Sequence, residues 1–439
     1  MEKDRFLKAP RIRGVRVPHR KHTENEATRE LLKPARVTLL MSQHIGAPAT
    51  VCVNKGDEVF VGTKIGAANG FISADVHSSV SGKVAEITSV LSPSGQHVEA
   101  VVIESDGSFT PDASIAPPVV TDAQSLVEAV SHSGLVGLGG AGFPTNVKLA
   151  VPKGVEVDTL VINGAECEPY ITSDYREMIE HPDDVIEGVT RVKKLLGLKR
   201  AIIGIESNKP EAIKLLKEKS NGEYEVMALK SSYPQGAEKT LIANTTGRAV
   251  RAGKLPSDAG VVVLNIGTAA FIARYLKTGM PLVAKRITVS GDGIKNGGNL
   301  MVPVGTDIAE VIAACGGYTG EIEKLLLGGP MMGVALYTDN YPVVKNTNAI
   351  LALTKASAPP TEDNPCIHCG RCVNTCPMLL SPAEIQVAFE ADNVEALNKL
   401  GVSNCMECGC CTFMCPARRP ITQIMRLSKL KIRKAAVKK

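Results

Sequence analysis

Two cysteine runs with identical spacing constrain this chain more than any other feature. Eight of its twelve cysteines fall into them: Cys366-x₂-Cys369-x₂-Cys372-x₃-Cys376-Pro377 and Cys405-x₂-Cys408-x₂-Cys411-x₃-Cys415-Pro416. Three thiolates at this spacing wrap one face of an iron–sulfur cubane, and the proline turns the chain so that the fourth thiolate reaches a neighbouring cluster. The last part of the chain is therefore expected to fold around two adjacent clusters.

The spacing also predicts which thiolates share a cluster, because in two-cluster ferredoxins the fourth cysteine of each run binds the other cluster. One [4Fe–4S] cluster is assigned Cys366, Cys369, Cys372 and Cys415, and the other is assigned Cys405, Cys408, Cys411 and Cys376. Structural zinc favours two well-separated C-x₂-C pairs, and disulfides do not suit a chain without a secretion signal. Cys410, which interrupts the second run, is expected only to fill space. Two adjacent clusters carry single electrons, but they do not say what supplies or takes them.

A glycine-rich segment, GLVGLGGAGFPTNVKL at 134–149, spells G-x-G-x-x-G through Gly137, Gly139 and Gly142. A Rossmann fingerprint must follow a strand and open a long helix. Here the preceding residues have a helical pattern and two prolines follow soon after, so the Rossmann interpretation is disfavoured. Glycine backbone without side chains can still bind phosphate. In such a site Phe143 could stack on the ring of a nucleotide, and Lys148 could form an ion pair with the phosphate. Spacing alone leaves both a nucleotide cradle and an ordinary turn open.

The rest of the chain divides into segments of different pattern. Residues 37–110 show short alternating strands between turn residues and resemble a barrel-sandwich hybrid of the biotinyl/lipoyl type, although the HSSVSG turn has no Lys to carry a prosthetic group. Residues 119–284 alternate apolar strands with helical stretches, as a layered α/β domain does. A strand–strand–helix–strand pattern over 285–333 indicates a β-grasp unit, and residues 359–425 hold the cysteine runs in a helical, ferredoxin-like domain. The predicted fold class is thus multidomain α+β.

Several motifs together resemble known families. GLGGAGFPTNVKL, followed by VINGAECEPY, SSYPQGAEKTL and VLNIGTAA, is similar to the FMN- and NADH-binding subunit of respiratory complex I. With the N-terminal barrel, the β-grasp (SLBB) unit, LLLGGPMMG and the cysteine runs added, the motif order from about 37 to about 425 resembles the RnfC (RsxC) family of the Rnf ion-translocating electron transport complex. The resemblance implies bound FMN, NAD(H) as substrate and an oxidoreductase activity that includes the two clusters.

The same resemblance implies where the cofactors bind. Gly137, Gly139, Gly140 and Lys148 match the loop around the FMN phosphate and ring, Asn163 and Asn265 match polar groups on the flavin, and Tyr233, Gly236 and Glu238 match a second wall. Phe143 and Glu168 match residues that meet the nicotinamide nucleotide, and Glu166 belongs to the same segment. Glu166 and Glu168 could otherwise be solvated acids at a strand end.

The sequence departs from the complex I pattern at two positions. Leu138 stands where that subunit has Arg, and Ala165 stands where it has Asp. Both changes remove polar groups near the cofactor and favour the Rnf branch. The cofactors supply the chemistry of such a site, so no side chain is predicted to act as a general acid or base.

Positive charge is concentrated at the two ends. Residues 1–36 hold 11 Lys or Arg against five acids, and residues 426–439 hold seven and no acid. Such ends are most often solvated, and the alternative is contact with an acidic partner or anionic lipid headgroups. The sequence shows no signal peptide and no apolar run of roughly 18 residues, and aromatic residues, at 4%, are too scarce for a nucleic-acid-binding platform. We expect a soluble chain that other members of the complex hold at the cytoplasmic face of the membrane.

The expected function is that of an NAD(H)-oxidoreductase subunit in a complex that couples electron flow between ferredoxin and NAD to Na⁺ or H⁺ movement. Two alternatives stay open. One is a soluble NADH-dependent reductase that feeds a corrinoid enzyme or a selenoenzyme, and the N-terminal barrel argues against it. The other is an electron-wire subunit with a vestigial flavin site, which Leu138 and Ala165 would allow and the intact motifs elsewhere argue against.

Overall fold

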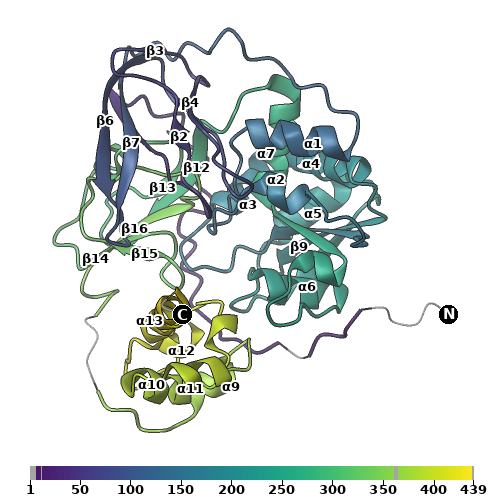
Figure 1. Cartoon of the computed structure of the whole chain (residues 1–439), viewed down its shortest axis with the longest axis vertical. Helices are drawn as coiled ribbons and strands as arrows, with labels where there is room; N and C mark the ends of the chain where they lie inside the picture. Colours follow the sequence, from purple (N-terminus) through teal and green to yellow (C-terminus); the bar gives the residue numbers. More distant parts are fainter. Residues whose placement is uncertain (1–5, 11, 360–363, 438–439) are drawn as a thin grey trace.

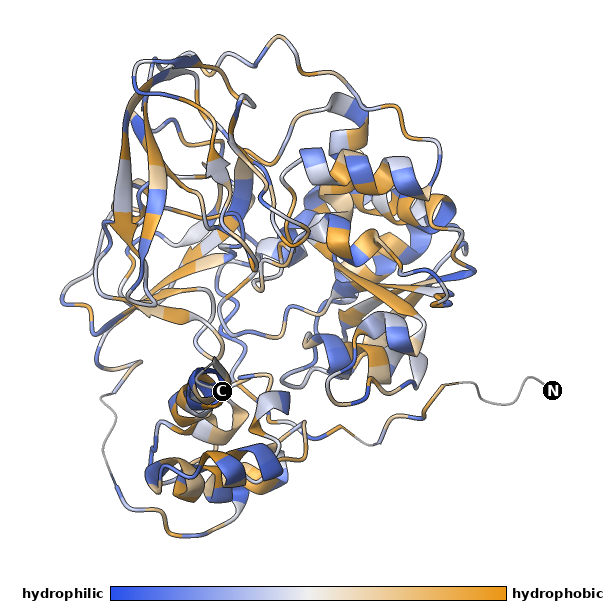
Figure 2. Cartoon of the chain, in the orientation of Figure 1, coloured by the Kyte–Doolittle hydropathy of each residue, from blue (hydrophilic) through white to orange (hydrophobic). Residues whose placement is uncertain are grey.

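The computed structural model describes residues 6–10, 12–359 and 364–437. A β-rich part and an α/β part lie side by side in Figure 1, and a helical part lies below them. Each part has its own hydrophobic core, as expected for a chain too long for a single one. In Figure 2 the strands of the α/β part are hydrophobic along their length, whereas its helices show one hydrophobic and one hydrophilic side. This architecture agrees with the predicted multidomain α+β fold class.

Residues 36–105 form two antiparallel sheets around a small apolar core. One has the order β1 (Arg36–Leu40), β7 (His97–Ser105), β6 (Gly82–Leu91), β3 (Glu58–Val59), and the other has the order β2 (Thr50–Val51), β4 (Lys64–Ala67), β5 (Val76–His77). The HSSVSG turn at 77–82 is buried, and Ser79 Oγ donates a hydrogen bond to Val304 O (2.6 Å). The turn at the position where carrier domains bear their prosthetic group therefore packs against the domain at 284–353.

Residues 123–278 form a parallel sheet with helices on both faces. The strand order is β10 (Glu225–Leu229), β9 (Arg200–Glu206), β8 (Thr159–Gly164), β11 (Val261–Asn265). One face is covered by α6 (Glu238–Thr246), and the other by α1 (Ala123–His132), α3 (Ser173–Glu180), α4 (Pro182–Leu195), α5 (Pro210–Lys219) and α7 (Ile266–Thr278). The chain runs from β8 outward to β10 and only then adds β11 on the other side of β8. A topological switch point therefore lies between β8 and β11.

Residues 284–353 form a second sheet with mixed strand directions. Its order is β13 (Gly298–Pro303), β12 (Ala284–Ser290), β16 (Ala349–Leu353), β14 (Lys324–Leu327), β15 (Val334–Leu336), and α8 (Ile308–Ala314) packs on it. Strands β12 and β16 are parallel, and the other neighbours are antiparallel. The central strand β16 comes from beyond residue 333, the predicted end of the β-grasp unit, and all five of its residues are buried.

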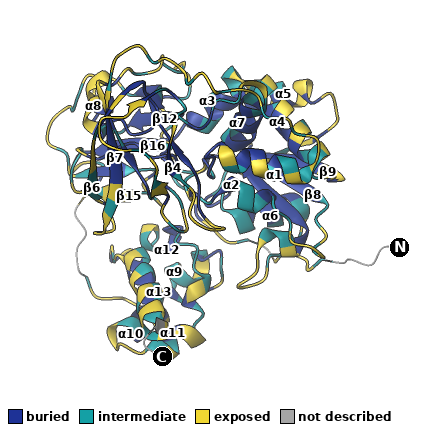
Figure 3. Ribbon diagram, turned by 45° about the horizontal axis from the view of Figure 1, so that its top comes forward, coloured by how far each residue is buried: buried dark blue, intermediate teal, exposed yellow. Residues whose placement is uncertain are grey.

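The helical part holds both cysteine runs. Its helices are α9 (Arg371–Thr375), α10 (Pro382–Glu390), α11 (Val394–Lys399), α12 (Cys410–Phe413) and α13 (Ile421–Val437). They pack around Ile385, Leu397 and Met425, and α9 of the first run lies against α12 of the second. Figure 3 shows exposed residues on the outer faces of these helices. The two cysteine runs are therefore neighbours in space although about 40 residues separate them in sequence.

Residues 6–10 and 12–35, here called the N-terminal strap, run across the other parts of the molecule. Val15 pairs with Tyr233 in a short antiparallel bridge, and Arg29 N donates to Asn299 O (2.8 Å) in the second sheet. Arg29 Nη2 binds two further carbonyls of that domain, each at 2.9 Å. The prediction of a solvated basic end is therefore wrong at Arg29, whose guanidinium binds backbone carbonyls, whereas Arg16, Lys33 and Arg36 of the same segment are exposed.

The basic C-terminal end is also ordered in part. Arg426 and Lys429 of α13 both pair with Glu407, at 3.1 and 2.7 Å, so the prediction of a solvated end at 426–439 is wrong there. Arg433 and Lys434 are exposed, and residues 438–439 lie outside the described ranges. In the part of the chain that the structure describes, no helix has the length and apolar character needed to cross a bilayer.

Candidate functional site

Most of the predicted flavin residues gather at the carboxyl ends of β8 and β11, beside the switch point, and this region is called the crevice below. Asn163 and Asn265 lie at these strand ends and face each other in register. Asn265 also caps α7, because its Oδ1 accepts hydrogen bonds from Gly267 N (2.9 Å) and Thr268 N (3.2 Å). Its Nδ2 donates to Asp174 (2.6 Å). In open parallel sheets, ligands bind in the crevice beside a switch point, so the topology and the glycine motif indicate the same place.

Leu138 anchors the glycine loop to the body of the domain. Its N–H donates to Thr268 Oγ1 (3.1 Å), and its carbonyl accepts from the buried Lys285 Nζ (2.6 Å). Burial lowers the pKa of Lys285 to about 8. The Leu138 side chain lies in the hydrophobic core under the loop. This departure from the complex I pattern therefore places an apolar side chain in the core, away from the crevice.

The glycines of the loop keep its backbone close to the crevice. A Cβ on Gly139 would lie 3.2 Å from Asn265 Nδ2, so a side chain would fill the space beside the asparagine. Gly140 has φ of +121°, a conformation that L-residues with a side chain rarely adopt. Asn346 Nδ2 donates to Gly140 O (2.7 Å) and holds the loop from outside the domain. The loop therefore presents bare backbone on its crevice side.

A second wall faces this loop across the crevice. Lys148 of α2 (Thr145–Leu149) pairs with Glu238 at the start of α6 (2.7 Å), and Asn163 Nδ2 donates to Gly236 O (2.8 Å). No side chain caps α6, so the N–H groups of its first turn are available to an anion. The structure thus brings together Gly139, Gly140, Lys148, Asn163, Gly236, Glu238 and Asn265. Gly137 N donates to Phe143 O (2.8 Å) and closes the base of the loop, and the Phe143 side chain is half-buried.

Glu166 is turned into the protein instead of the crevice. Its Oε1 accepts from Asp174 N (2.7 Å), and its Oε2 has no hydrogen-bond partner among the described residues and lies 4.0 Å from Lys21 Nζ. Burial raises the pKa of Glu166 to about 7, and the Lys21 charge opposes this rise. Lys21 Nζ also donates to the carbonyls of Glu166, Glu168 and Ile171. The interpretation of Glu166 as a solvated strand-end acid therefore does not apply.

Glu168 and Tyr233 point toward the cysteine-rich part. The two oxygens of Glu168 accept from Met331 N (3.0 Å) and Met332 N (2.9 Å). The Tyr233 hydroxyl donates to Cys408 O (2.7 Å) and lies 3.3 Å from Glu168. Burial raises the pKa of both side chains. Their roles at the nicotinamide and at the second wall stay predictions. Tyr233 joins the α/β part to the helical part, and Glu168 joins it to the segment between β14 and β15.

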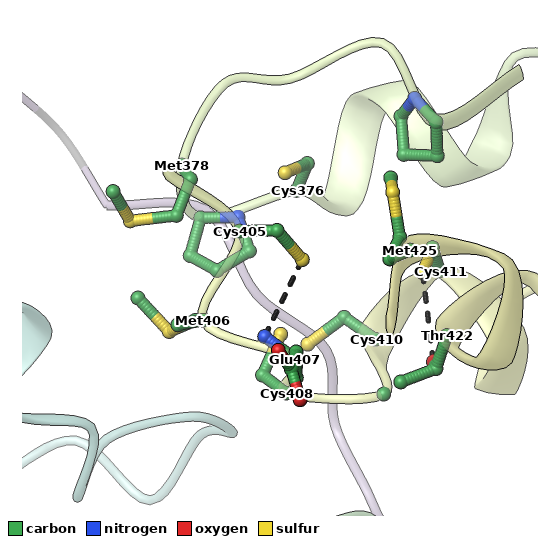
Figure 4. A pocket seen from close by; sticks show the side chains of 13 residues that line it. Cys376, Met378, Cys405, Met406, Glu407, Cys408, Cys410, Cys411, Thr422 and Met425 are labelled. Carbon is green, nitrogen blue, oxygen red and sulfur yellow. Dashed lines mark hydrogen bonds between the residues drawn. The ribbon is translucent and has the colours of Figure 1, made fainter. Parts of the chain in front are cut away.

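The four thiols assigned to one cluster line a single pocket. Cys376 of the first run meets Cys405, Cys408 and Cys411 of the second run there (Figure 4). Burial raises the pKa of Cys405 to about 11 and that of Cys411 to about 12, and neighbouring thiols add to both shifts. Cys410 lines the same pocket. This arrangement agrees with the assigned ligand set, which includes one thiol from the other run.

The other assigned set lies nearer the surface. Cys366 and Cys369 are exposed, whereas Cys372 in α9 and Cys415 after α12 are half-buried. Within the described ranges, no three His, Cys, Asp or Glu side chains are arranged to hold one metal ion.

Two residues outside every sequence motif also shape the crevice. Asn346 holds Gly140, and the neighbouring Lys345 is fully buried, with Nζ donating to the carbonyls of Gly134 (2.8 Å) and Asp75. Both residues lie in the segment that leads into β16. The only signal in the sequence is the polar run KNTN between two apolar stretches, and nothing in that run indicates which loop it holds.

Four known domain families match successive segments of the chain, and these segments correspond to the four parts of the structure. Family models match residues 11–108 (RnfC barrel sandwich hybrid domain), 130–274 (Nuo51 FMN-binding domain), 286–335 (SLBB domain) and 359–416 (4Fe-4S dicluster domain). The C subunit of the Na⁺-translocating ferredoxin:NAD⁺ oxidoreductase complex of Acetobacterium woodii is 47% identical over 378 residues, 85% of each chain. The chain belongs to the RnfC family. The C subunit of the proton-translocating ferredoxin:NAD⁺ oxidoreductase complex of Clostridium ljungdahlii is 40% identical, and the match covers 95% of this chain and 92% of that one.

The RnfC assignment confirms the predicted family, the fold class and the FMN and [4Fe–4S] cofactors. A chain of the NAD⁺-reducing [NiFe]-hydrogenase shares part of the fold, with a TM-score of 0.50 at 18% identity, over 64% of this chain and 55% of that one. The individual binding residues and the domain boundaries stay predictions.

The crevice fits FMN by the chemistry of its groups. Gly139 and Gly140 place no side chain beside Asn265, Asn163 and Asn265 offer amide groups, and Lys148 beside the uncapped start of α6 suits a phosphate. Glu238 holds the Lys148 ammonium in this position. An acid is thus present at the proposed phosphate end, and its charge is compensated by this lysine.

Proposed function

We propose that this RnfC chain is the NAD(H)-oxidoreductase subunit of an ion-translocating membrane complex, in which it passes electrons between NADH, FMN and two [4Fe–4S] clusters. Its relatives are named as subunits of complexes that join ferredoxin and NAD⁺ to Na⁺ or proton translocation. Because those two relatives differ in the coupling ion, the ion is a property of the other subunits in this proposal.

The residues of the crevice hold and orient the flavin. Lys148 and the first turn of α6 bind the phosphate, while Asn163 and Asn265 bind polar edges of the ring. Phe143, half-buried at the base of the glycine loop, stacks on the nicotinamide nucleotide. Bound FMN supplies two-electron exchange with nicotinamide and one-electron exchange with clusters, and the protein supplies orientation and electrostatics.

The contact between Tyr233 and Cys408 is the observation that carries the proposal. It joins the loop that bears Gly236, part of the flavin wall, directly to a ligand of the buried cysteine set. The other cysteine set reaches the surface through Cys366 and Cys369. In this proposal the buried set exchanges electrons with the flavin, and the exposed set exchanges them with an electron-transfer partner.

The partners in this proposal are the other subunits of the complex, including its ferredoxin-like and membrane-spanning ones. They hold the chain as a peripheral subunit at the cytoplasmic face of the membrane, and the chain exchanges electrons with ferredoxin only indirectly. Nucleic acid has no part in this function.

Anaerobic purification and reconstitution of the full chain tests the proposal. About eight irons per chain with bound FMN, bleaching of the flavin by NADH without an added acceptor, and NADH-dependent reduction of ferricyanide in a separate assay are the expected results. Little iron with stoichiometric zinc would refute the cluster assignment. Full iron with FMN that NADH does not bleach would instead favour an electron-wire subunit with a vestigial flavin site.

A further inference from the structure

Tyr233 lies at the centre of the contact between the flavin wall and the helical part. Its side chain is only 1% exposed, and its backbone pairs with Val15 of the strap through two hydrogen bonds of 2.8 and 2.9 Å. A tyrosine hydroxyl has one proton to donate. The hydroxyl oxygen lies 2.7 Å from Cys408 O and 3.3 Å from Glu168 Oε1, so the hydrogen bond to Cys408 is the shorter one. The side chain is therefore fixed from both ends, by the strap and by a cluster ligand.

Glu168 holds a second connection beside the first. It accepts hydrogen bonds from Met331 N and Met332 N, and a Cβ on Gly329 would overlap its Oε2. The Met331 carbonyl in turn lies 2.6 Å from the position of a Cβ on Gly409, which has φ of +82°. Glycine at 409 thus allows the cysteine loop to rest directly on the segment that Glu168 holds.

The surroundings of the Tyr233 hydrogen bond are apolar. Val15, Tyr233, Cys408 and Cys410 form one buried cluster, with Val17, Cys167, Met331, Met406 and Met414 packed around it. The hydrogen bond from Tyr233 to Cys408 O is buried there, where a hydrogen bond is strong and an unpaired group is costly, whereas those from Met331 N and Met332 N to Glu168 are part-buried and exposed. If Glu168 and Tyr233 turned to a nucleotide, the donors at Met331 and Met332 and the Cys408 carbonyl would lose these partners.

We propose that Tyr233 and Glu168 are positioning residues that clamp the Cys405–Cys411 loop against the flavin wall and so control electron transfer into the buried cluster. They do this in place of direct contact with the nicotinamide nucleotide. The clamp deepens the proposed function, since its effect on electron transfer matters only if the flavin reduces this cluster. Its structural consequence, an ordered cysteine loop, can be measured independently of NADH oxidation.

The test compares Tyr233→Phe and Glu168→Gln with Tyr337→Phe in the full reconstituted chain. Tyr337 is a matched control, because its hydroxyl also donates to a carbonyl, Leu91 O (2.7 Å), but at an exposed site in another part of the molecule. Tyr233→Phe is expected to speed hydrogen–deuterium exchange of residues 405–411 about tenfold, which corresponds to about 1.4 kcal/mol for one lost hydrogen bond. Glu168→Gln is expected to speed exchange in 329–333 as well.

A second readout separates positioning from general destabilisation. In stopped-flow mixing with NADH, both variants are expected to lower the ratio of the cluster-reduction rate to the flavin-bleaching rate, whereas Tyr337→Phe leaves it unchanged. Exchange at 405–411 equal to that of Tyr337→Phe would overturn the clamp. If Tyr233→Phe does not fold, Glu168→Gln decides alone. If NADH fails to bleach the flavin of the wild-type chain, the proposed function fails, but the exchange comparison still decides the clamp.

Discussion

The buried ammonium of Lys21 offers the sharpest test of how the strap supports the site. It lies under the GAECEP segment with its side chain 6% exposed, beside a Glu166 side chain that is 4% exposed. Replacing it by Met keeps the length and apolar stem of the side chain and removes the charge. Three backbone carbonyls then lose their donor, and Glu166 loses the cation nearest to its free oxygen.

The expected loss of stability is large. Removing one partner of a buried ion pair costs about 3–5 kcal/mol. With a urea m-value of roughly 2 kcal/mol per M, the unfolding midpoint falls by about 1.5–2.5 M. The loss also depends on pH. Burial already places the pKa of Glu166 near 7, and without Lys21 it rises further. A pKa that is higher in the folded than in the unfolded chain gives stability at low pH that is lost as the pH rises, so Lys21→Met is expected to be more harmful at pH 8 than at pH 5.

Urea titration followed by far-ultraviolet circular dichroism at both pH values measures this effect. Lys33→Met is the control, because Lys33 belongs to the same strap but is exposed, and it is expected to change stability by no more than about 0.5 kcal/mol. Adding Glu166→Gln to Lys21→Met is expected to restore part of the loss and to remove its pH dependence. Equal midpoints for the Lys21 and Lys33 variants would refute the reasoning.

Three further predictions concern the crevice, the pocket and a buried histidine. Lys148→Met is expected to weaken FMN binding about 10- to 100-fold in a fluorescence titration, since hydrogen bonds to charged groups contribute about 1.5–3 kcal/mol; unchanged affinity would exclude Lys148 from the phosphate site. Cys411→Ala is expected to leave about four irons per chain, whereas Cys410→Ala keeps about eight, and equal iron loss in both would make Cys410 a ligand. Burial lowers the pKa of His77 to about 3, so the unfolded chain takes up a proton between pH 6.5 and 3 that the folded chain does not. The contribution of His77 to the free energy of unfolding is then expected to fall by about 2 kcal/mol from pH 7 to pH 5, measured as the difference between the wild-type chain and a His77→Asn variant, and an identical pH dependence in the two would contradict this assignment.

Local sequence patterns were sufficient for the cofactor types and for most of one crevice. The cysteine spacing predicts a juxtaposition of Cys376 with the second run, because cubane geometry leaves few other ways to arrange eight such thiols. Asn163 and Asn265 follow apolar strands, and the carboxyl ends of neighbouring parallel strands must meet at one edge of the sheet. In both cases the constraint acts over a short stretch or follows from the regular geometry of a sheet.

Contacts between residues far apart in the sequence could not be predicted from such patterns. Lys21 and Arg29 lie in a basic segment whose composition suits solvent, and only carbonyls more than 140 residues away reveal their role. Glu168 and Tyr233 match flavin-site motifs by position, yet their side chains contact residues 331–332 and 408. A motif specifies where the backbone runs, but the direction of a side chain depends on which partner domain covers it.

The strap has a consequence for the order in which the newly made chain can complete its fold. Lys21 leaves the ribosome 145 residues before Glu166, and Arg29 leaves it 267 residues before Asn296. At a synthesis rate of roughly 5–20 residues per second, Glu166 is made about 7–30 s after Lys21, and Asn296 is made about 13–53 s after Arg29. The domains that form early must therefore leave the path of the strap open, and the strap can pack fully against them only after residue 296 has been made.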